Sequence, residues 1–291
     1  MRVSRSAWCI RGAIFPLLVG SLSPVAHAGS VLVPNAGVEV FRSWAALTEG
    51  FYSVEHAGSS RIIREGGVSS LSYGVTGTLL LGLDATVTRL DGQENKTTVE
   101  PDIRMKWNFW SKLSPGHYHR LAVQANLGVP LGDPSSYILD HNYTGPDGSN
   151  LRFIKPRIIP TVDLVYSRAT SRFVYGADLG YSVPTADHSG IRIGDLKKAS
   201  LDGEYAFWRG EKAEMSFVAG AMVRHFGQAH GGGATFADTG GSDVALSSGI
   251  QYAPMPTITF EASFTSDVWS VMRPGQPRMG NGVLFGIRFL R

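Results

Sequence analysis

The triplet Asp187-His188-Ser189 places an acid, a base and a hydroxyl nucleophile in consecutive positions. A serine hydrolase needs its nucleophile within hydrogen-bond reach of the base. Consecutive residues of a strand point to opposite faces, so this triplet can act only if it lies in a turn. It also lacks a His-x-Ser spacing, which would put both groups on one face of a strand. We therefore expect no enzymatic activity from the chain.

Other reactive residues are isolated in the sequence. Asp140-His141 has the residue types of an acid/base pair, but no second acidic pair accompanies it. His141, His225 and His230 do not have the spacing of a metal-ligand motif. The glycine run 231–233 is not followed by a strand-to-helix pattern, so it does not predict a phosphate-binding loop. We predict no metal and no cofactor.

The composition favours β structure and does not favour nucleic-acid binding. The 291 residues include 27 Lys+Arg and 24 Asp+Glu, which leaves little net positive charge to attract phosphates. The mean hydropathy of −0.02 is too low for a bundle of membrane helices. The 35 glycines and 10% aromatic residues are typical of all-β proteins with many short strands.

The N-terminal segment 1–28 has the order of a secretory signal peptide. A basic start leads into an apolar stretch at 12–22, and Ala26-His27-Ala28 forms a small-x-small cleavage site. This apolar stretch is shorter than the about 20 residues that a membrane-spanning helix needs. The single cysteine, Cys9, lies inside the leader. We therefore expect a mature chain without disulfides, thiol nucleophiles or cysteine-bound metals.

The segment 99–109 shows the pattern that dominates the rest of the chain. Its odd positions are apolar and its even positions are polar or charged. In a strand, the two sets face opposite sides of the sheet. The apolar set is Val99, Ile103, Met105, Trp107 and Phe109, and the polar set is Glu100, Asp102, Arg104, Lys106 and Asn108.

Segments of about ten residues with this alternation predict an all-β, antiparallel, up-and-down transmembrane β-barrel of about twelve strands. An even strand number puts both termini on the periplasmic side. We expect residues 29–46 to form a periplasmic tail or a short plug, and residues 47–291 to form the barrel. The predicted strands are 48–57, 67–75, 78–88, 99–109, 121–129, 158–166, 173–183, 198–207, 213–225, 243–252, 257–265 and 283–289.

The links between these segments alternate in length, as expected for a barrel with short periplasmic turns and long outer loops. A soluble two-sheet sandwich has no reason to keep this alternation. The barrel interpretation places the protein in the outer membrane of a Gram-negative cell. The short links are 76–77, 111–118, 168–172, 209–212 and 254–256, and the long links are 89–98, 130–152, 184–195, 226–242 and 266–280.

The chain ends in an alternating aromatic segment, 286–291, which resembles the terminal strand that the barrel-assembly machinery reads. It departs from the usual pattern because the last residue is Arg291 and the aromatic residue is Phe289. We expect this machinery as one partner. The other expected partners are outer-membrane lipid and lipopolysaccharide, and a small-molecule solute.

The polar positions of the strands would line the lumen of the barrel. Charges in a narrow lumen must be hydrated or paired. They either form a salt-bridged filling that only stabilises the barrel or line a polar path for a solute, and both interpretations stay open. The predicted lining residues are Asp84, Glu100, Asp102, Arg104, Lys106, Gln124, Asn126, Asp163, Asp178, Lys198, Asp202, Glu204, Arg224, Glu261 and Arg288.

Three glycine-containing segments resemble a known family. Residues 72–77 (SYGVTG) look like the "YGlT" hairpin, and residues 128–133 (GVPLGD) are similar to the strand ending in an "LPtGD" turn. Residues 240–252 resemble the penultimate hairpin. The family is that of the outer-membrane transporters of the meta-pathway of phenol degradation. The resemblance implies a channel or transporter for small solutes, with hydrophobic or aromatic compounds as candidates, and carries over no binding residue.

Three functions are therefore compared. The first is an outer-membrane channel or transporter for small solutes. The second is a lipid-modifying hydrolase of the outer membrane that uses His188 and Ser189. The third is a non-conducting structural or adhesive barrel, whose outer loops, especially 130–152, bind partners.

Overall fold

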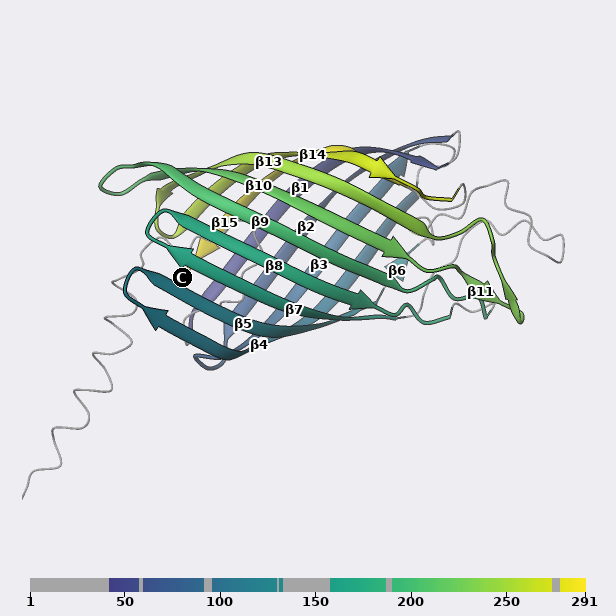
Figure 1. Cartoon of the computed structure of the whole chain (residues 1–291), viewed down its shortest axis with the longest axis horizontal. Coiled ribbons are helices and arrows are strands. Elements are labelled where there is room, and N and C mark those ends of the chain that lie inside the picture. The colour runs from purple at the N-terminus through teal and green to yellow at the C-terminus, as the bar shows by residue number, and fades with distance from the viewer. Residues whose placement is uncertain are drawn as a thin grey trace, which may run out of the picture.

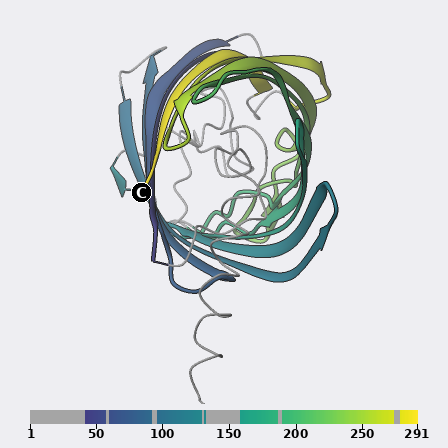
Figure 2. The ribbon, with the colours of Figure 1, turned by 90° about the vertical axis from the view of Figure 1, so that its left-hand side faces the viewer.

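The strands of the protein form one antiparallel sheet that closes on itself. The computed structural model describes residues 42–57, 60–91, 96–129, 131–132, 158–186, 190–273 and 278–291. Within these ranges, twelve long strands follow one another in chain order, and the last pairs with the first. Figure 2, seen from one end, shows the resulting ring. The prediction of an all-β, up-and-down barrel is confirmed.

The barrel strands are β1 (Trp44–Ala57), β2 (Ser60–Gly74), β3 (Leu79–Asp91), β4 (Lys96–Ser114), β5 (His117–Gly128), β7 (Ile159–Thr170), β8 (Phe173–Ser182), β9 (Leu196–Arg209), β10 (Glu214–Phe226), β13 (Gly241–Met255), β14 (Ile258–Ser270) and β15 (Arg278–Leu290). Three short strands lie outside this order. β6 (Leu131–Gly132) pairs with the start of β4, and β11 (His230–Gly231) forms a small hairpin with β12 (Ala234–Thr235).

Each predicted strand overlaps an observed one, but several strands are longer than their sequence pattern. The first strand begins at Trp44, before the predicted barrel boundary at residue 47. The predicted link 111–118 is wrong, because β4 continues to Ser114 and β5 begins at His117. Gly116 adopts a φ of 75° there, which lets the chain reverse in a tight turn.

The predicted long loop 89–98 is also mostly strand. The backbones of Arg89 and Thr97 pair, so β3 and β4 continue well into the predicted loop. Where both faces of a sheet meet water, polar residues can continue the backbone hydrogen-bond ladder. The alternation of apolar and polar residues then ends before the strand pairing does. The predicted signal peptide, and most of the predicted tail and of the loop 130–152, lie outside the described residues.

Two ends of the barrel can be distinguished. The turn end, at the left of Figure 1, carries the tight connections 75–78, 115–116, 171–172, 210–213 and 256–257. Trp44 and Arg291 also lie there, bonded to each other through both backbone N–H groups. The opposite end is the loop end. Short turns and chain termini mark the periplasmic side of such barrels. No helix in the described ranges is long and apolar enough to cross a membrane.

The outer face of the barrel is apolar. Large side chains such as Leu83, Ile103, Leu179 and Leu201 are 60%, 60%, 60% and 65% exposed, yet each alternates with a polar or small residue on the inner face. Apolar side chains buried in the wall are mostly alanine and valine. This arrangement suits hydrocarbon outside and polar groups inside. By fold and surface, the chain is an outer-membrane barrel.

Aromatic side chains gather at the turn end, and tyrosine and tryptophan favour the boundary between hydrocarbon and headgroups. Trp110, Tyr175, Phe207 and Tyr252 are all more than 40% exposed near tight turns. Tyr118, at the same end, differs from these residues because its ring lies under the Arg120 guanidinium, with Arg120 Cζ 4.2 Å from the ring centroid.

At the loop end, two connections form a small folded unit. Ile191, Ala229 and Phe236 form a buried apolar cluster. Arg192 and His230 exchange two backbone hydrogen bonds, which join the connection before β9 to the one after β10. Partial burial opposes ionisation of Asp195, but hydrogen bonds from Tyr181 and Arg192 outweigh it and lower the pKa of Asp195.

The depth of the apolar band can be tested by placing a charge on the outer face. Leu83→Arg, in the middle of the band, is expected to lower the free energy of unfolding by about 2–4 kcal/mol, whereas Ile258→Arg, on the outer face beside the turn 256–257, costs about 0–1 kcal/mol. Denaturant titration of the protein refolded in lipid vesicles measures both. Equal costs at the two positions would contradict the assignment of the band.

Candidate functional site

The predicted lining residues all lie in described strands, on the face opposite the exposed apolar side chains. Asp163, for example, is 1% exposed and lies between the exposed Val162 and Leu164. In a closed barrel, this face is the interior. The inner face is therefore the candidate functional site. That these side chains form a path for a solute stays a prediction.

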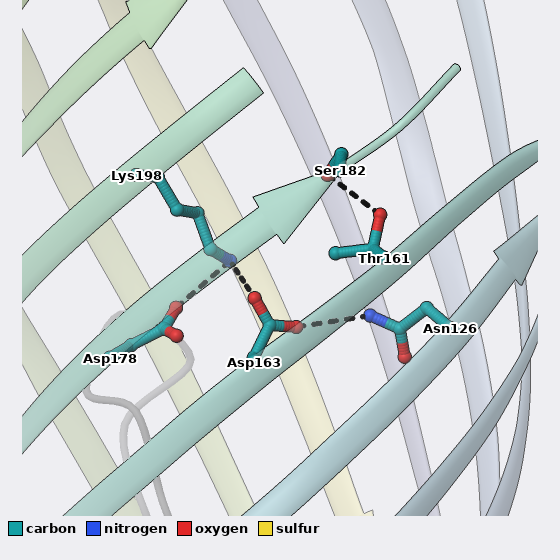
Figure 3. A network of polar contacts seen from close by, with 6 residues as sticks. All are labelled: Asn126, Thr161, Asp163, Asp178, Ser182 and Lys198. Atoms are coloured by element: carbon teal, nitrogen blue, oxygen red, sulfur yellow. Dashed lines mark hydrogen bonds and ion pairs between the residues drawn. The ribbon is translucent and has the colours of Figure 1, made fainter. Parts of the chain in front are cut away.

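An extended contact network centres on Lys198 of β9. Its Nζ lies 2.9 Å from Oδ2 of Asp178 on β8 and 3.1 Å from Oδ1 of Asp163 on β7. Figure 3 shows Lys198 between the two carboxylates, with Asn126 donating to Asp163 from the other side at 3.4 Å. The lysine thus joins side chains from three neighbouring strands.

A glycine makes this bridge possible. Gly180 of β8 pairs with Asp163 on one side and with Lys198 on the other. A Cβ atom at residue 180 would collide with both the Asp163 carboxylate and the Lys198 side chain. Because no side chain stands there, Lys198 lies flat across β8 and reaches β7 along the wall.

A charged side chain that extends over a glycine also occurs elsewhere on the inner face. Arg104 of β4 lies over Gly82 of β3, where a Cβ would come within 2.9 Å of its Nε. It contacts Asp84 at 3.1 Å and donates to Ser70 of β2 at 2.8 Å. In both networks a cation crosses one strand over a glycine and makes contact two strands away.

Carboxylates also lie over glycines. Asp202 of β9 lies across Gly220 of β10, where a Cβ would collide with its carboxylate. Asp102 lies across Gly128 of β5, where a Cβ would come within 2.5 Å of its Oδ1. These charged side chains therefore lie along the wall.

Two further pairs are made directly across neighbouring strands. Arg224 of β10 donates from Nε and Nη2 to Asp243 of β13, at 3.0 and 2.6 Å, and Asp243 is fully buried. Gln251 donates to Glu261 of β14 at 2.6 Å. Two-point contact with a carboxylate fixes the arginine side chain in one orientation. Removing one partner of such a buried pair costs about 3–5 kcal/mol, because a charge is left uncompensated.

Sequence reasoning missed several members of this site. Glu49 of β1 and Asp243 of β13 carry inner-face charges, but both lie in strands with weak alternation. The recesses at Gly82, Gly180 and Gly220 were also missed. Their role depends on which residue lies opposite on the next strand, and a single strand's sequence does not give that register. With these additions, carboxylates outnumber cations among the described inner-face side chains.

Of the residues considered for catalysis or metal binding, the structure describes only His225 and His230. Residues 187–189 and 140–141 lie outside the described ranges. His225 contacts Ser242 at 2.9 Å, and His230 contacts Thr235 at 3.0 Å. Within the described ranges, no three His, Cys, Asp or Glu side chains are placed to hold a metal ion.

No protein-family model matches the chain, and no curated protein matches it. Its fold is similar to the COG4313 outer membrane channel from Pseudomonas putida F1. The TM-score is 0.64 at 12% identity, over 90% of this chain and 100% of that chain. The NanC porin gives a TM-score of 0.48 at 11% identity, over 84% of this chain and 98% of that chain. The CymD monoaromatic hydrocarbon channel gives 0.41 at 10% identity, over 87% and 88%.

At these identities, the likeness to the COG4313 barrel shows the fold alone. The fold agrees with the predicted outer-membrane location. Membership of the phenol-degradation transporter family stays a prediction, because no sequence match supports it.

The role of the glycine recess can be tested with Gly180→Ala. The added methyl group displaces Lys198 from Asp163, so we expect a loss of about 1–3 kcal/mol in the free energy of unfolding, the usual cost of overpacking. Gly203→Ala is the matched control, since its new Cβ meets its nearest atom at 3.8 Å. Equal losses in the two variants, measured by denaturant titration, would show that the recess has no special role.

Proposed function

We propose that this chain is a passive outer-membrane channel for small polar solutes. The observation that carries the proposal is the arrangement of the inner face, where charged side chains are paired along the wall over glycines. Among the described residues, side chains held in this way lie along the wall and do not extend toward the axis, which favours a path for water and solute. A filling that only stabilised the barrel would instead join opposite walls.

The chemistry of the inner face favours a polar solute over a hydrophobic one. A hydrophobic compound passing Asp163 and Lys198 would displace water from an ion pair and offer no hydrogen bond in return. A polar solute can replace that water with its own donors and acceptors. Hydrophobic or aromatic compounds, which the family resemblance implied, are therefore the less favoured substrates.

The inner face also predicts a charge preference. Carboxylates outnumber cations there, and Asp102 and Asp202 form no ion pair with a described residue. Fixed negative charge in a narrow polar path attracts cations and repels anions. The path is thus expected to favour cations and neutral polar solutes.

The test is the current through single molecules of the refolded mature protein in a planar bilayer. We expect steady conductance and, in a salt gradient, a reversal potential that shows cation preference. A folded barrel that passes no current would overturn the proposal. Heat-modifiable mobility on a gel confirms that the protein tested is folded.

Asp102→Asn together with Asp202→Asn is expected to lower the ratio of cation to anion permeability. A unit charge about 7 Å from a permeating ion is worth about 0.6 kcal/mol in water. Because it attracts the cation and repels the anion by this amount, each charge removed lowers the ratio roughly sevenfold. Glu65→Gln is the control, because Glu65 pairs with Arg89 on the outer face of the wall. If the control and the double variant change the permeability ratio equally, the two carboxylates do not line the path.

A further inference from the structure

A row of basic side chains crosses the outer face of the barrel near the turn end. Lys112 of β4 pairs in register with His119 of β5, and His119 pairs with Arg168 of β7. Side chains alternate along a strand. Because Ala122 of β5 and Val165 of β7 are buried on the inner face, His119 and Arg168 lie on the outer face. These three strands are neighbours at the lower left of Figure 1.

Aromatic rings border this basic row on the side of the apolar band. The Trp110 ring lies 6.4 Å from the His119 ring, and the Tyr166 ring lies 6.2 Å from it on the other side. The Tyr166 hydroxyl and His119 Nδ1 are 2.8 Å apart. Tryptophan and tyrosine favour the boundary between hydrocarbon and headgroups. The row therefore lies at the depth of the lipid headgroups.

The cations of the row lack a protein counter-charge. Within the described ranges, Lys112 and Arg168 form no ion pair, and Arg168 Nε is buried without a hydrogen-bond partner. The inner face differs sharply, since Arg104, Lys198 and Arg224 are each held by a carboxylate. At the depth of the headgroups, the phosphate of a lipid is the anion present at the highest local concentration.

We propose that the row Lys112–His119–Arg168 binds the headgroup of an anionic phospholipid in the membrane leaflet at the turn end. The phosphate lies between Lys112 and Arg168, whose fixed positive charges attract it. The acyl chains follow the apolar outer face of β5 and β7, along Leu121 and Leu164. The site lies on the outside of the wall and is independent of conduction.

The experiment places the refolded mature protein in micelles with equal parts of phosphatidylglycerol and phosphatidylcholine. The lipids that stay bound after removal of the excess are measured by mass spectrometry. We expect the wild-type protein to retain phosphatidylglycerol preferentially. Lys112→Gln and Arg168→Gln are each expected to lower that preference roughly fivefold, on the scale of one Lys or Arg near an anionic surface.

Lys212→Gln is the matched control, because Lys212 is an exposed cation at the same end, in the turn between β9 and β10. It should leave the preference unchanged. Arg168→Lys keeps the charge and should keep most of the preference, which separates lost binding from lost packing. Equal retention of the two lipids by the wild-type protein, or an unchanged preference in the Lys112→Gln/Arg168→Gln double variant, would overturn the proposal.

Discussion

The structure depends on the closure of one hydrogen-bond ladder. In hydrocarbon, an unpaired backbone N–H or C=O group costs several kcal/mol, so a sheet that spans a membrane cannot keep a free edge. The pairing of β1 with β15, from Ala45 with Leu290 to His56 with Arg278, removes both edges at once. The reciprocal bonds between Trp44 and Arg291 secure this seam at the turn end.

Closure gives the sheet an inside and an outside, and this reverses the usual distribution of side chains. The large apolar residues lie outside, where lipid surrounds them. Carboxylates and cations lie inside. Where a small residue lies between two of these charged residues, their side chains can extend along the wall of the barrel instead of across the lumen. Gly82 and Gly180 have this role, because each lets a cation extend over one strand and bind beyond it. Pairing along the wall lowers the cost of burying charge without filling the centre of the barrel.

The two surfaces of the wall treat cations differently, and this difference has a physical cause. On the inner face, Lys198 has carboxylates within reach because neighbouring strands supply them. On the outer face at the turn end, Lys112 and Arg168 each pair in register with His119, whose ring lies near two aromatic rings, and neither cation has a described ion-pair partner. The alternation that predicts a barrel thus also separates two groups of charged side chains. Those on the inner face are paired with other protein side chains, and those on the outer face at the turn end are exposed to lipid headgroups.

The sequence alone was enough to predict the barrel, because alternation with period two is a local signal that repeats in every strand. Strand ends were less predictable. The segment 111–118 is mostly polar and was expected to be a link, yet Ser114 and His117 pair and continue the backbone hydrogen-bond ladder between β4 and β5. The inner-face residues followed from alternation as well, as Asp163 and Arg224 show. Their partners did not, because the contacts of Lys198 over Gly180 and of Arg224 with Asp243 depend on the register between strands.

The proposed channel requires that water and solute reach the charged inner face while the outer face lies in lipid. Because the mature chain is expected to lack cysteine, single cysteines can be placed at Ser200 on the inner face and at Leu201 on the outer face of β9. The measurement is labelling of each variant, in lipid vesicles, by a charged thiol reagent that does not cross membranes. We expect labelling at residue 200 and protection at residue 201. Protection at both positions, in a barrel shown to be folded, would contradict an open aqueous interior.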